Sequence, residues 1–363
     1  MTRVLVWQWG RRGAGPRIAV ELARALRLVP GTTAFLSLST GAEILGGAGA
    51  PVCDLPVATY NGAMGLLGRL LLAPVMIVSL IRHLRRLRPD AAICAMPGPL
   101  DLLMVAALAW TGTKLLVIVH DADSHPGERA PLLMWLQRRL ARRADALVAL
   151  STHVAERLRA QGLAAPGKPV FALRHPPMSI GAPPPPPFAH EGPTRLLFFG
   201  RLLAYKGLDL LSEALPLTGD RPMEVRIVGS GPESDALAAL RGQHCVTVEN
   251  RWVAEEAVAG VIGWADILVL PYREASQSGA AAVALAAGRW VVATRIGGLM
   301  EQLADEPLAV LCDPDAASLA AALRDLNGTK PPPPASGAGA DAAWLDLATA
   351  LIGCLAHGTR EPH

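Results

Sequence analysis

The chain has 363 residues, of which 51% are hydrophobic, and a formal net charge of only +3. This length suits two domains of ordinary size, each with its own hydrophobic core. The small net charge gives no indication of a nucleic-acid-binding protein. The arginines nevertheless gather in two stretches, Arg82–Arg88 and Arg138–Arg143.

The five cysteines are widely scattered, at positions 53, 94, 245, 312 and 354. No pair has metal-ligand spacing and no disulfide framework is visible, so we expect free thiols in a reducing compartment. The N-terminus reaches a predicted strand, Arg3–Trp7, without the long apolar stretch of a signal peptide. These features predict a cytoplasmic protein.

A glycine-rich loop follows the first predicted strand. It contains Gly10, Gly13 and Gly15, and apolar residues at helical spacing then predict a helix over Ile18–Leu28. Such a loop lets a phosphate or a sugar approach the backbone, so Gly13 and Gly15 are candidate substrate-binding residues. Their spacing is not that of a dinucleotide-binding fingerprint, and a flexible turn explains them equally well.

The most apolar stretch is Gly62–Ile81, which Arg69 and Pro74 interrupt. Its length approaches the roughly 20 residues that span a bilayer. Because of the central proline and the arginine, we expect most of it to form a buried crossover helix instead. The basic stretch Arg82–Arg88 follows directly, which leaves a second interpretation open: contact with an anionic membrane surface through Gly62–Arg88.

Two histidines and two aspartates follow the predicted strand Lys114–Val119 within six residues. They are His120, Asp121, Asp123 and His125. Side chains of these types can bind a metal, cap a turn, or face a substrate at the end of a buried strand. The residues alone leave these three interpretations open.

Five consecutive prolines, Pro183–Pro187, predict a stiff connector between two domains. Strands alternate with helices on both sides of it, which predicts an α/β protein with two parallel sheets covered by helices on both faces. We therefore divide the chain into an N-terminal domain over residues 1–182, a second domain over 183–340, and a terminal segment over 341–363 that begins with an apolar helix.

The second domain contains a predicted strand, Ile267–Leu270, then a polar loop and a helix over Ala280–Ala287. Ligands of open parallel sheets bind at the carboxyl ends of strands. Hydroxyls, a side-chain amide and free N–H groups at the start of a helix suit phosphate oxygens, although an ordinary helix cap explains them equally well. The residues concerned are Ser276, Gln277, Ser278 and Gly279.

Four short motifs occur in order in this half of the chain. They are Gly200-Arg201 with Lys206-Gly207, Gly229-Ser-Gly231-Pro232, Pro271-Tyr272-Arg-Glu274, and Gly297-Gly298-Leu-Met-Glu301. As a set, over about residues 195–305, they resemble the nucleotide-binding half of the GT-B glycosyltransferases of group 1, family 4-like. The resemblance implies two Rossmann-like domains that face a central cleft, with a C-terminal helix that crosses back to the first domain.

The resemblance also implies a donor substrate, a UDP- or GDP-linked sugar, and no other cofactor. Arg201 and Lys206 would contact the donor diphosphate, where negative charge develops as the sugar departs. A guanidinium fork and an ammonium suit that role, and with both present we expect no divalent metal. The segment around His120 resembles the family position that faces the reaction centre, which makes His120 a third catalytic candidate.

The candidate substrate-binding residues share a position at the carboxyl end of a predicted strand or in the loop that follows. They are Gly13, Gly15, Gly200, Gly229, Gly231, Pro232, Tyr272, Ser276, Gln277, Ser278, Gly279 and Glu301.

The chain departs from the family pattern in its carboxylates. Family members carry two glutamates eight positions apart around this loop and helix. Here Glu274, a fourth catalytic candidate, stands for the first only if the loop is offset, and the second falls on Ala282 or Val283. Glu301 is the remaining carboxylate that could bind the ribose. The Ser-Gln-Ser-Gly variant therefore leaves the stereochemical outcome open, although the family implies retention.

These features together predict a hexosyltransferase of bacterial polysaccharide or glycolipid synthesis. We expect it to act on a glycan or lipid-linked acceptor, as a peripheral protein on the cytoplasmic face of the inner membrane, with no nucleic-acid partner. Two alternatives remain: a catalytically silent GT-B protein that binds a nucleotide sugar or a partner enzyme, and a sugar-nucleotide epimerase of the same architecture.

Overall fold

The computed structural model describes residues 1–357 except 48, 125, 127–130, 166, 180–185 and 330–337. The chain forms two compact units. Unit 1 contains Met1–Ser124, Ala130–Arg174 and the C-terminal segment from Asp341, and unit 2 is built mainly from His175–Ala340. Most of the proposed proline connector lies outside the described residues.

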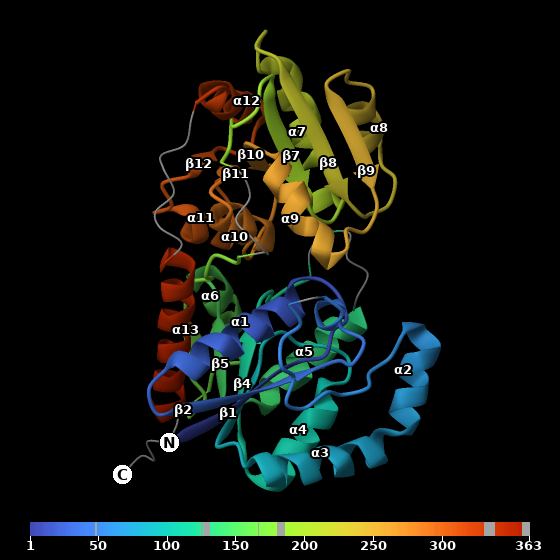
Figure 1. Cartoon of the computed structure of the whole chain (residues 1–363), viewed down its shortest axis with the longest axis vertical. Helices are drawn as coiled ribbons and strands as arrows, with labels where there is room; N and C mark the ends of the chain where they lie inside the picture. Colours follow the sequence, from blue (N-terminus) through green and yellow to red (C-terminus); the bar gives the residue numbers. More distant parts are fainter. Residues whose placement is uncertain are drawn as a thin grey trace. The chain divides into compact units, whose positions relative to one another are not determined.

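Unit 1 is organised around a six-stranded parallel sheet with the strand order β2-β1-β3-β4-β5-β6 (Figure 1). The chain enters at β1, pairs it with β2 from Thr2 opposite Thr32 to Gln8 opposite Leu38, and then continues on the other side of β1. The strands are β1 (Thr2–Gln8), β2 (Thr32–Leu38), β3 (Ala91–Cys94), β4 (Lys114–Val119), β5 (Ala146–Ala149) and β6 (Val170–Ala172).

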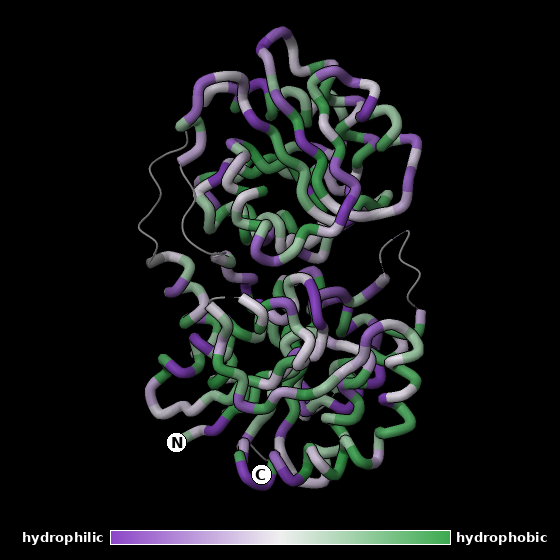
Figure 2. The backbone as a smooth tube through the Cα atoms, turned by 45° about the vertical axis from the view of Figure 1, so that its right-hand side comes forward, coloured by the Kyte–Doolittle hydropathy of each residue, from purple (hydrophilic) through white to green (hydrophobic). Residues whose placement is uncertain are grey.

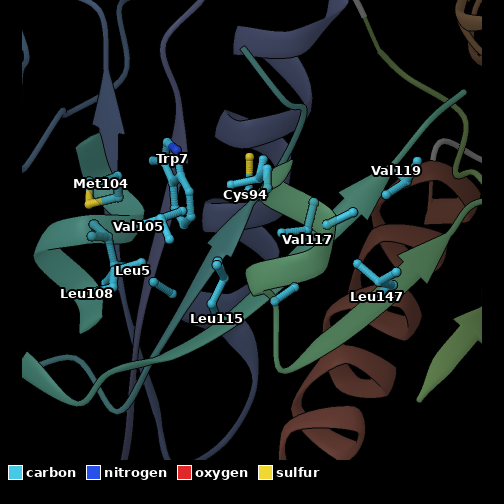
Figure 3. Packing of buried hydrophobic residues seen from close by; sticks show 14 of the residues in the cluster. Leu5, Trp7, Cys94, Met104, Val105, Leu108, Leu115, Val117, Val119 and Leu147 are labelled. Atoms are coloured by element: carbon cyan, nitrogen blue, oxygen red, sulfur yellow. The ribbon is translucent and has the colours of Figure 1, made fainter. Parts of the chain in front are cut away.

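Helices cover both faces of this sheet. The unit contains α1 (Ala14–Leu28), α2 (Gly62–Leu71), α3 (Ala73–Leu87), α4 (Asp101–Thr111), α5 (Pro131–Arg143), α6 (Thr152–Ala160), α13 (Ala338–His357) and the short 3-10 turn η1 (Glu43–Leu45). Because side chains alternate along a strand, one set from each strand packs against α3, α4, α5 and α6 (Figure 3). Leu5 and Trp7 of β1 lie in this core, against Met104 of α4.

The C-terminal helix α13 belongs to unit 1 although its residues are the last in the sequence. Asp341 near its start forms an ion pair with Arg24 of α1. Trp344, Leu347 and Leu351 are buried, which fixes the apolar side of the helix. The terminal helix therefore returns to the first unit, as the fold prediction requires.

Unit 2 contains a second six-stranded parallel sheet, with the order β12-β11-β10-β7-β8-β9. Its strands are β7 (Thr194–Phe199), β8 (Met223–Gly229), β9 (Val246–Asn250), β10 (Ile267–Leu270), β11 (Trp290–Thr294) and β12 (Ala309–Cys312). Its helices and turns are η2 (Ala204–Lys206), α7 (Leu208–Ala214), η3 (Leu215–Leu217), α8 (Asp235–Arg241), α9 (Glu255–Trp264), α10 (Gly279–Ala286), α11 (Gly297–Leu303) and α12 (Ala316–Leu326).

Hydrophobic segments run through the interior of each unit (Figure 2). Two parallel sheets with flanking helices confirm the predicted α/β fold class. In unit 2 the chain winds outward from β7 in one direction and from β10 in the other. Strand order therefore reverses between β7 and β10, and ligands of open parallel sheets bind at the carboxyl ends of the strands at such a switch point.

The prediction that Gly62–Ile81 is mostly a buried helix is wrong. The segment forms two helices, α2 and α3, that meet at an angle of 71° (Figure 1). None of the residues of α2, all of which the structure describes, is buried, and α3 buries only Leu80 and Leu84. Pro74 lies in the first turn of α3, where it lacks the N–H that would continue a hydrogen-bond ladder from α2.

Within the described residues, no single helix is both long and apolar enough to cross a membrane. The bent pair α2 and α3 passes that test of length and composition only when the two helices are taken together.

Candidate functional site

The loops after β7 and β10 lie on either side of the switch point of unit 2 and are joined to each other. The backbone N–H of Arg273 in the second loop donates to the carbonyl of Tyr205 in the first, at 2.8 Å. Arg273 also pairs with Asp209 of α7, Nη2 to Oδ2 at 2.6 Å. The two loops therefore form one surface at the carboxyl end of the sheet.

Two glycines permit this close approach. A Cβ atom on Gly207, which has a φ of +66°, would lie 1.7 Å from the carbonyl oxygen of Pro271. A Cβ atom on Gly229 would lie 1.7 Å from the carbonyl oxygen of Gly200. Only glycine allows backbone contacts of this kind, so these residues hold the loops after β7, β8 and β10 together.

The two predicted cations meet around one aromatic side chain. Arg201 donates from Nη2 to the hydroxyl of Tyr205 at 2.6 Å. The ammonium nitrogen of Lys206 lies 4.8 Å from the centroid of the same ring and 3.6 Å from that of Tyr272. Aromatic ring faces attract cations at such distances. The structure thus brings together Arg201, Lys206 and the predicted Tyr272.

The loop after β10 leads into the start of α10 as predicted. Ser278 caps the helix, because its hydroxyl accepts a hydrogen bond from the N–H of Ala281 at 3.2 Å. The same hydroxyl lies 3.4 Å from that of Tyr272, whose carbonyl accepts from the hydroxyl of Thr294 at 2.5 Å. Ser276 is buried as well. Hydrogen bonds therefore tie the loop to the start of α10 and to the end of β11.

Gln302 of α11 is a residue that holds this loop and that the sequence interpretation missed. Its Oε1 accepts from the N–H of Ser278 at 2.8 Å, and its Nε2 donates to the Ser278 carbonyl at 3.0 Å. The predicted Glu301 beside it is exposed, as is Glu274. The glycine pair Gly297-Gly298 predicts a tight loop from sequence, but in the structure these residues begin α11. Helical spacing from Gly298 would have placed Gln302 on the buried side.

The turn after β8 is tied to the end of β9. The side-chain amide of Asn250 accepts from the N–H of Gly231 and donates to its carbonyl, both at 3.1 Å. A Cβ atom on Gly231 would lie 2.2 Å from the carbonyl oxygen of Leu202, which packs this turn against the loop after β7. Pro232 is exposed beyond it.

In unit 1, His120 is buried at the end of β4. Its Nε2 donates to the carbonyl oxygen of Ala95, which follows β3, at 2.8 Å. Burial lowers the pKa of His120, so the imidazole is held neutral near pH 7. Asp123 pairs with Arg157 and accepts from Gln161 of the next helix region, both at 2.8 Å, which fits the turn interpretation of this loop.

His125 lies outside the described residues. Within the part of the chain that the structure describes, no group of three or more histidine, cysteine, aspartate or glutamate side chains is arranged to hold a metal ion.

The glycine-rich loop after β1 makes room for a buried side chain. Gly13 precedes α1 with a φ of +81°. A Cβ atom on Gly15 would lie 2.7 Å from Nε2 of Gln8 and 3.2 Å from the sulfur of Met96. Gln8 itself accepts from the N–H of Gly10 at 2.9 Å. The space beside Gly15 is therefore filled by protein atoms.

The sequence matches two family models that together cover both units. The model described as "Glycosyl transferase 4-like domain" matches residues 3–172, and the one described as "Glycosyl transferases group 1" matches residues 193–328. The chain belongs to the group 1, family 4-like glycosyltransferases. This membership confirms the family that the motifs of the second domain predict.

Characterised relatives of this glycosyltransferase chain align with part of it. Glycogen synthase of Mycobacterium tuberculosis (strain CDC 1551 / Oshkosh) is 35% identical over 150 residues, 39% of this chain and 36% of the relative. GDP-mannose:glycolipid 4-beta-D-mannosyltransferase of Xanthomonas campestris pv. campestris is 30% identical over 106 residues, 28% of this chain and 30% of the relative. The chain therefore aligns with only about a third of each relative's length.

Solved structures of the same fold align along nearly the whole chain. That of Anabaena HepE in complex with UDP and glucose superposes with a TM-score of 0.67 at 17% identity, covering 98% of this chain and 100% of the other. This similarity supports the GT-B fold.

Proposed function

We propose that the protein transfers a hexose from a nucleotide diphosphate sugar, UDP- or GDP-linked, to an acceptor hydroxyl, and that unit 2 binds the donor. One observation carries this proposal: Arg201 and Lys206 both contact Tyr205. They lie at the switch point of the sheet, where Ser278 caps the start of α10. Family membership supports the same reaction class.

In this reaction the bond between the anomeric carbon and the β-phosphate oxygen breaks, and the leaving diphosphate takes the electron pair. Arg201 and Lys206 stabilise that charge, and the N-terminus of α10, which begins at Gly279, favours negative charge as well. The acceptor oxygen bonds to the anomeric carbon and loses its proton. His120, held neutral by burial, is suited to hydrogen-bond a sugar or acceptor hydroxyl. Retention of configuration is part of the proposal on family grounds, with Glu274 facing the sugar.

The first test is a thermal-shift screen of UDP- and GDP-linked hexoses. A bound donor is expected to stabilise the fold, by about 2.7 kcal/mol when its concentration is a hundred times its dissociation constant. Lys206→Ala should reduce the stabilisation, and Arg324→Ala, an exposed arginine of α12, is the matched control. No shift with any donor would contradict the proposal.

Two measurements separate the alternatives. A catalytically silent binding protein would show the thermal shift but consume no donor when candidate acceptors are added. An epimerase would change the donor sugar without any acceptor, which NMR of the sugar signals detects. A transferase consumes donor and forms free nucleotide in proportion to the glycosylated acceptor.

We expect turnover to be independent of divalent metals. Two cations already lie where the diphosphate would bind, so a metal is not required to neutralise it. Initial rates should be unchanged, within a factor of about two, after incubation with excess EDTA. Lost activity that Mg²⁺ or Mn²⁺ restores would contradict this expectation and direct attention to Asp121 and Asp123.

We further propose that unit 1 docks peripherally on the cytoplasmic face of a bacterial inner membrane, where it glycosylates a lipid-linked acceptor of polysaccharide or glycolipid synthesis. Apolar side chains of α2 and the start of α3 are exposed to solvent, with Met64 at 80%, Leu71 at 77% and Val75 at 67%. The basic segment Arg82–Arg88 follows. The name of the Xanthomonas relative, which includes a glycolipid acceptor, supports this choice.

Helix α5 of unit 1 also exposes an aromatic side chain next to a basic one. Trp135 is 50% exposed, and the guanidinium carbon of Arg139 lies 4.9 Å from its ring centroid. Amphipathic helices with aromatic and basic residues bind at the interface between headgroups and acyl chains.

We expect the purified protein to float with vesicles that contain anionic lipid, and to dissociate as salt rises. Each arginine near an anionic leaflet contributes about 1 kcal/mol, so replacing Arg82, Arg85, Arg86 and Arg88 with serine should reduce binding at least tenfold. Arg241→Ser with Arg295→Ser, two exposed arginines of unit 2, is the control. Failure to float at low salt would contradict membrane docking.

A further inference from the structure

Tyr205 contacts both cations of the proposed donor site. Its hydroxyl accepts from Nη2 of Arg201 at 2.6 Å, and its ring centroid lies 4.8 Å from the ammonium nitrogen of Lys206. The side chain is only 3% exposed, whereas Arg201 is exposed and Lys206 is half-buried. A buried neutral group thus supports two charged groups at the surface.

Tyr272 contacts the ammonium of Lys206 with a second ring, at 3.6 Å from its centroid. Both side chains are buried, and the loops that carry them are held through their backbone carbonyls. The carbonyl of Tyr205 accepts from the N–H of Arg273, and the carbonyl of Tyr272 accepts from Thr294. The rings therefore have defined positions, and Lys206 takes its position from them.

Two like charges that lie close together repel each other, and each long side chain loses rotamer entropy when it is ordered. Groups that stabilise a developing charge are most effective when they are already ordered before the reaction. The hydroxyl of Tyr205 orders the Arg201 guanidinium, whose carbon also lies 5.7 Å from the ring centroid, and the ring orders the Lys206 ammonium.

We propose that Tyr205 is a positioning residue, which orders Arg201 through its hydroxyl and Lys206 through its ring so that both can bind the donor diphosphate. The proposal rests on the proposed function for the identity of the ligand. Its own content is that Tyr205 acts on the ligand through Arg201 and Lys206 and does not contact it.

The test is a double-mutant cycle on nucleotide affinity. Tyr205→Phe removes the hydrogen bond to Arg201 but keeps the ring beside Lys206. A hydrogen bond to a charged group is typically equivalent to about a tenfold or larger change in affinity. We expect calorimetry with UDP, or with GDP if it binds more tightly, to show a loss of about tenfold for Tyr205→Phe.

The cycle separates positioning from general stabilisation. In the Arg201→Ala background, Tyr205→Phe should cause no further loss, because the group through which it acts is gone. In the Lys206→Ala background the loss of about tenfold should persist. Tyr205→Leu, which removes both the hydroxyl and the ring, should lose more nucleotide affinity than Tyr205→Phe. Tyr60→Phe, the remaining tyrosine of the chain and part of unit 1, should bind nucleotide as the unmodified protein does.

Two results would overturn the proposal: unchanged affinity in a folded Tyr205→Phe variant, or losses that multiply when Tyr205→Phe and Arg201→Ala are combined. If Tyr205→Phe does not fold, Tyr205→Gln provides the second test. Its amide oxygen can still accept from Arg201 but the ring beside Lys206 is gone, so its loss of affinity should persist in the Arg201→Ala background and vanish in the Lys206→Ala background. Because the cycle measures nucleotide binding, it gives a result even if the protein transfers no sugar. Absence of turnover with an intact cycle would overturn the transferase function alone.

Discussion

Replacing Lys206 with alanine is expected to lower turnover about a hundredfold or more while the protein stays folded. The ammonium lies beside two tyrosine rings at the switch point of unit 2, at the carboxyl end of the buried strand β7. Removing one such fixed charge from a leaving diphosphate costs a few kcal/mol of transition-state stabilisation. Arg201→Ala should behave similarly.

The measurement is the initial rate at saturating donor, with circular dichroism to verify folding. Arg324→Ala, which removes an exposed arginine of α12, should keep the rate of the unmodified protein. Near-normal turnover of Lys206→Ala at saturating donor would contradict the proposal that Lys206 binds the donor diphosphate, because a side chain that stabilises the leaving diphosphate is needed for a normal rate.

The donor half could be predicted because its local signals agree with one another. The strand Ile267–Leu270 and the start of α10 at Gly279 occur where the sequence indicated. The four aliphatic residues Ile267–Leu270 lie between Asp266 and Pro271, and a short apolar run with such boundaries predicts a buried strand. Ser278 is a preferred capping residue, and the structure shows it capping α10.

Contacts between distant segments could not be predicted in this way. Gln302 reaches the backbone of Ser278, 24 positions earlier, and only the packing of α11 against the loop brings them together. The role of Tyr205 likewise depends on which way Arg201 and Lys206 turn. The exposure of α2 was missed for a different reason. An apolar sequence indicates removal from water, but it does not distinguish a protein core from another apolar surface.

The second large expected effect is on stability: the free energy of unfolding should depend on pH through the buried carboxyl of Asp101. Asp101 is the first residue of α4 and is 1% exposed. Its Oδ2 accepts from the N–H of Gly98 at 2.7 Å and from the thiol of Cys94 at 3.4 Å. Burial raises the pKa of Asp101 from 3.8 to about 7, and these hydrogen bonds offset the effect only in part. The pKa values of Cys94 and Tyr60 are also raised, so neither thiol nor phenol titrates below pH 8.

Because the folded state holds this proton more tightly than the unfolded chain, the stabilisation is full below about pH 4 and is lost as pH rises through about 7. A shift of this size corresponds to about 4 kcal/mol of unfolding free energy. Burial lowers the pKa of His120, which acts in the opposite direction over part of the range. A variant that changes Asp101 alone separates the two contributions.

Asp101→Asn keeps an oxygen that can accept from Gly98 but cannot ionise. We expect the unfolding free energy of the unmodified protein, measured by urea denaturation at intervals between pH 4.5 and 8, to fall with pH relative to that of the variant. The difference should change by about 3 kcal/mol between pH 4.5 and 8, because part of the effect already lies below pH 4.5. Asp325→Asn, an exposed aspartate of α12, should follow the unmodified protein at every pH. Parallel curves for Asp101→Asn and the unmodified protein would contradict a raised pKa of the Asp101 carboxyl in the folded state.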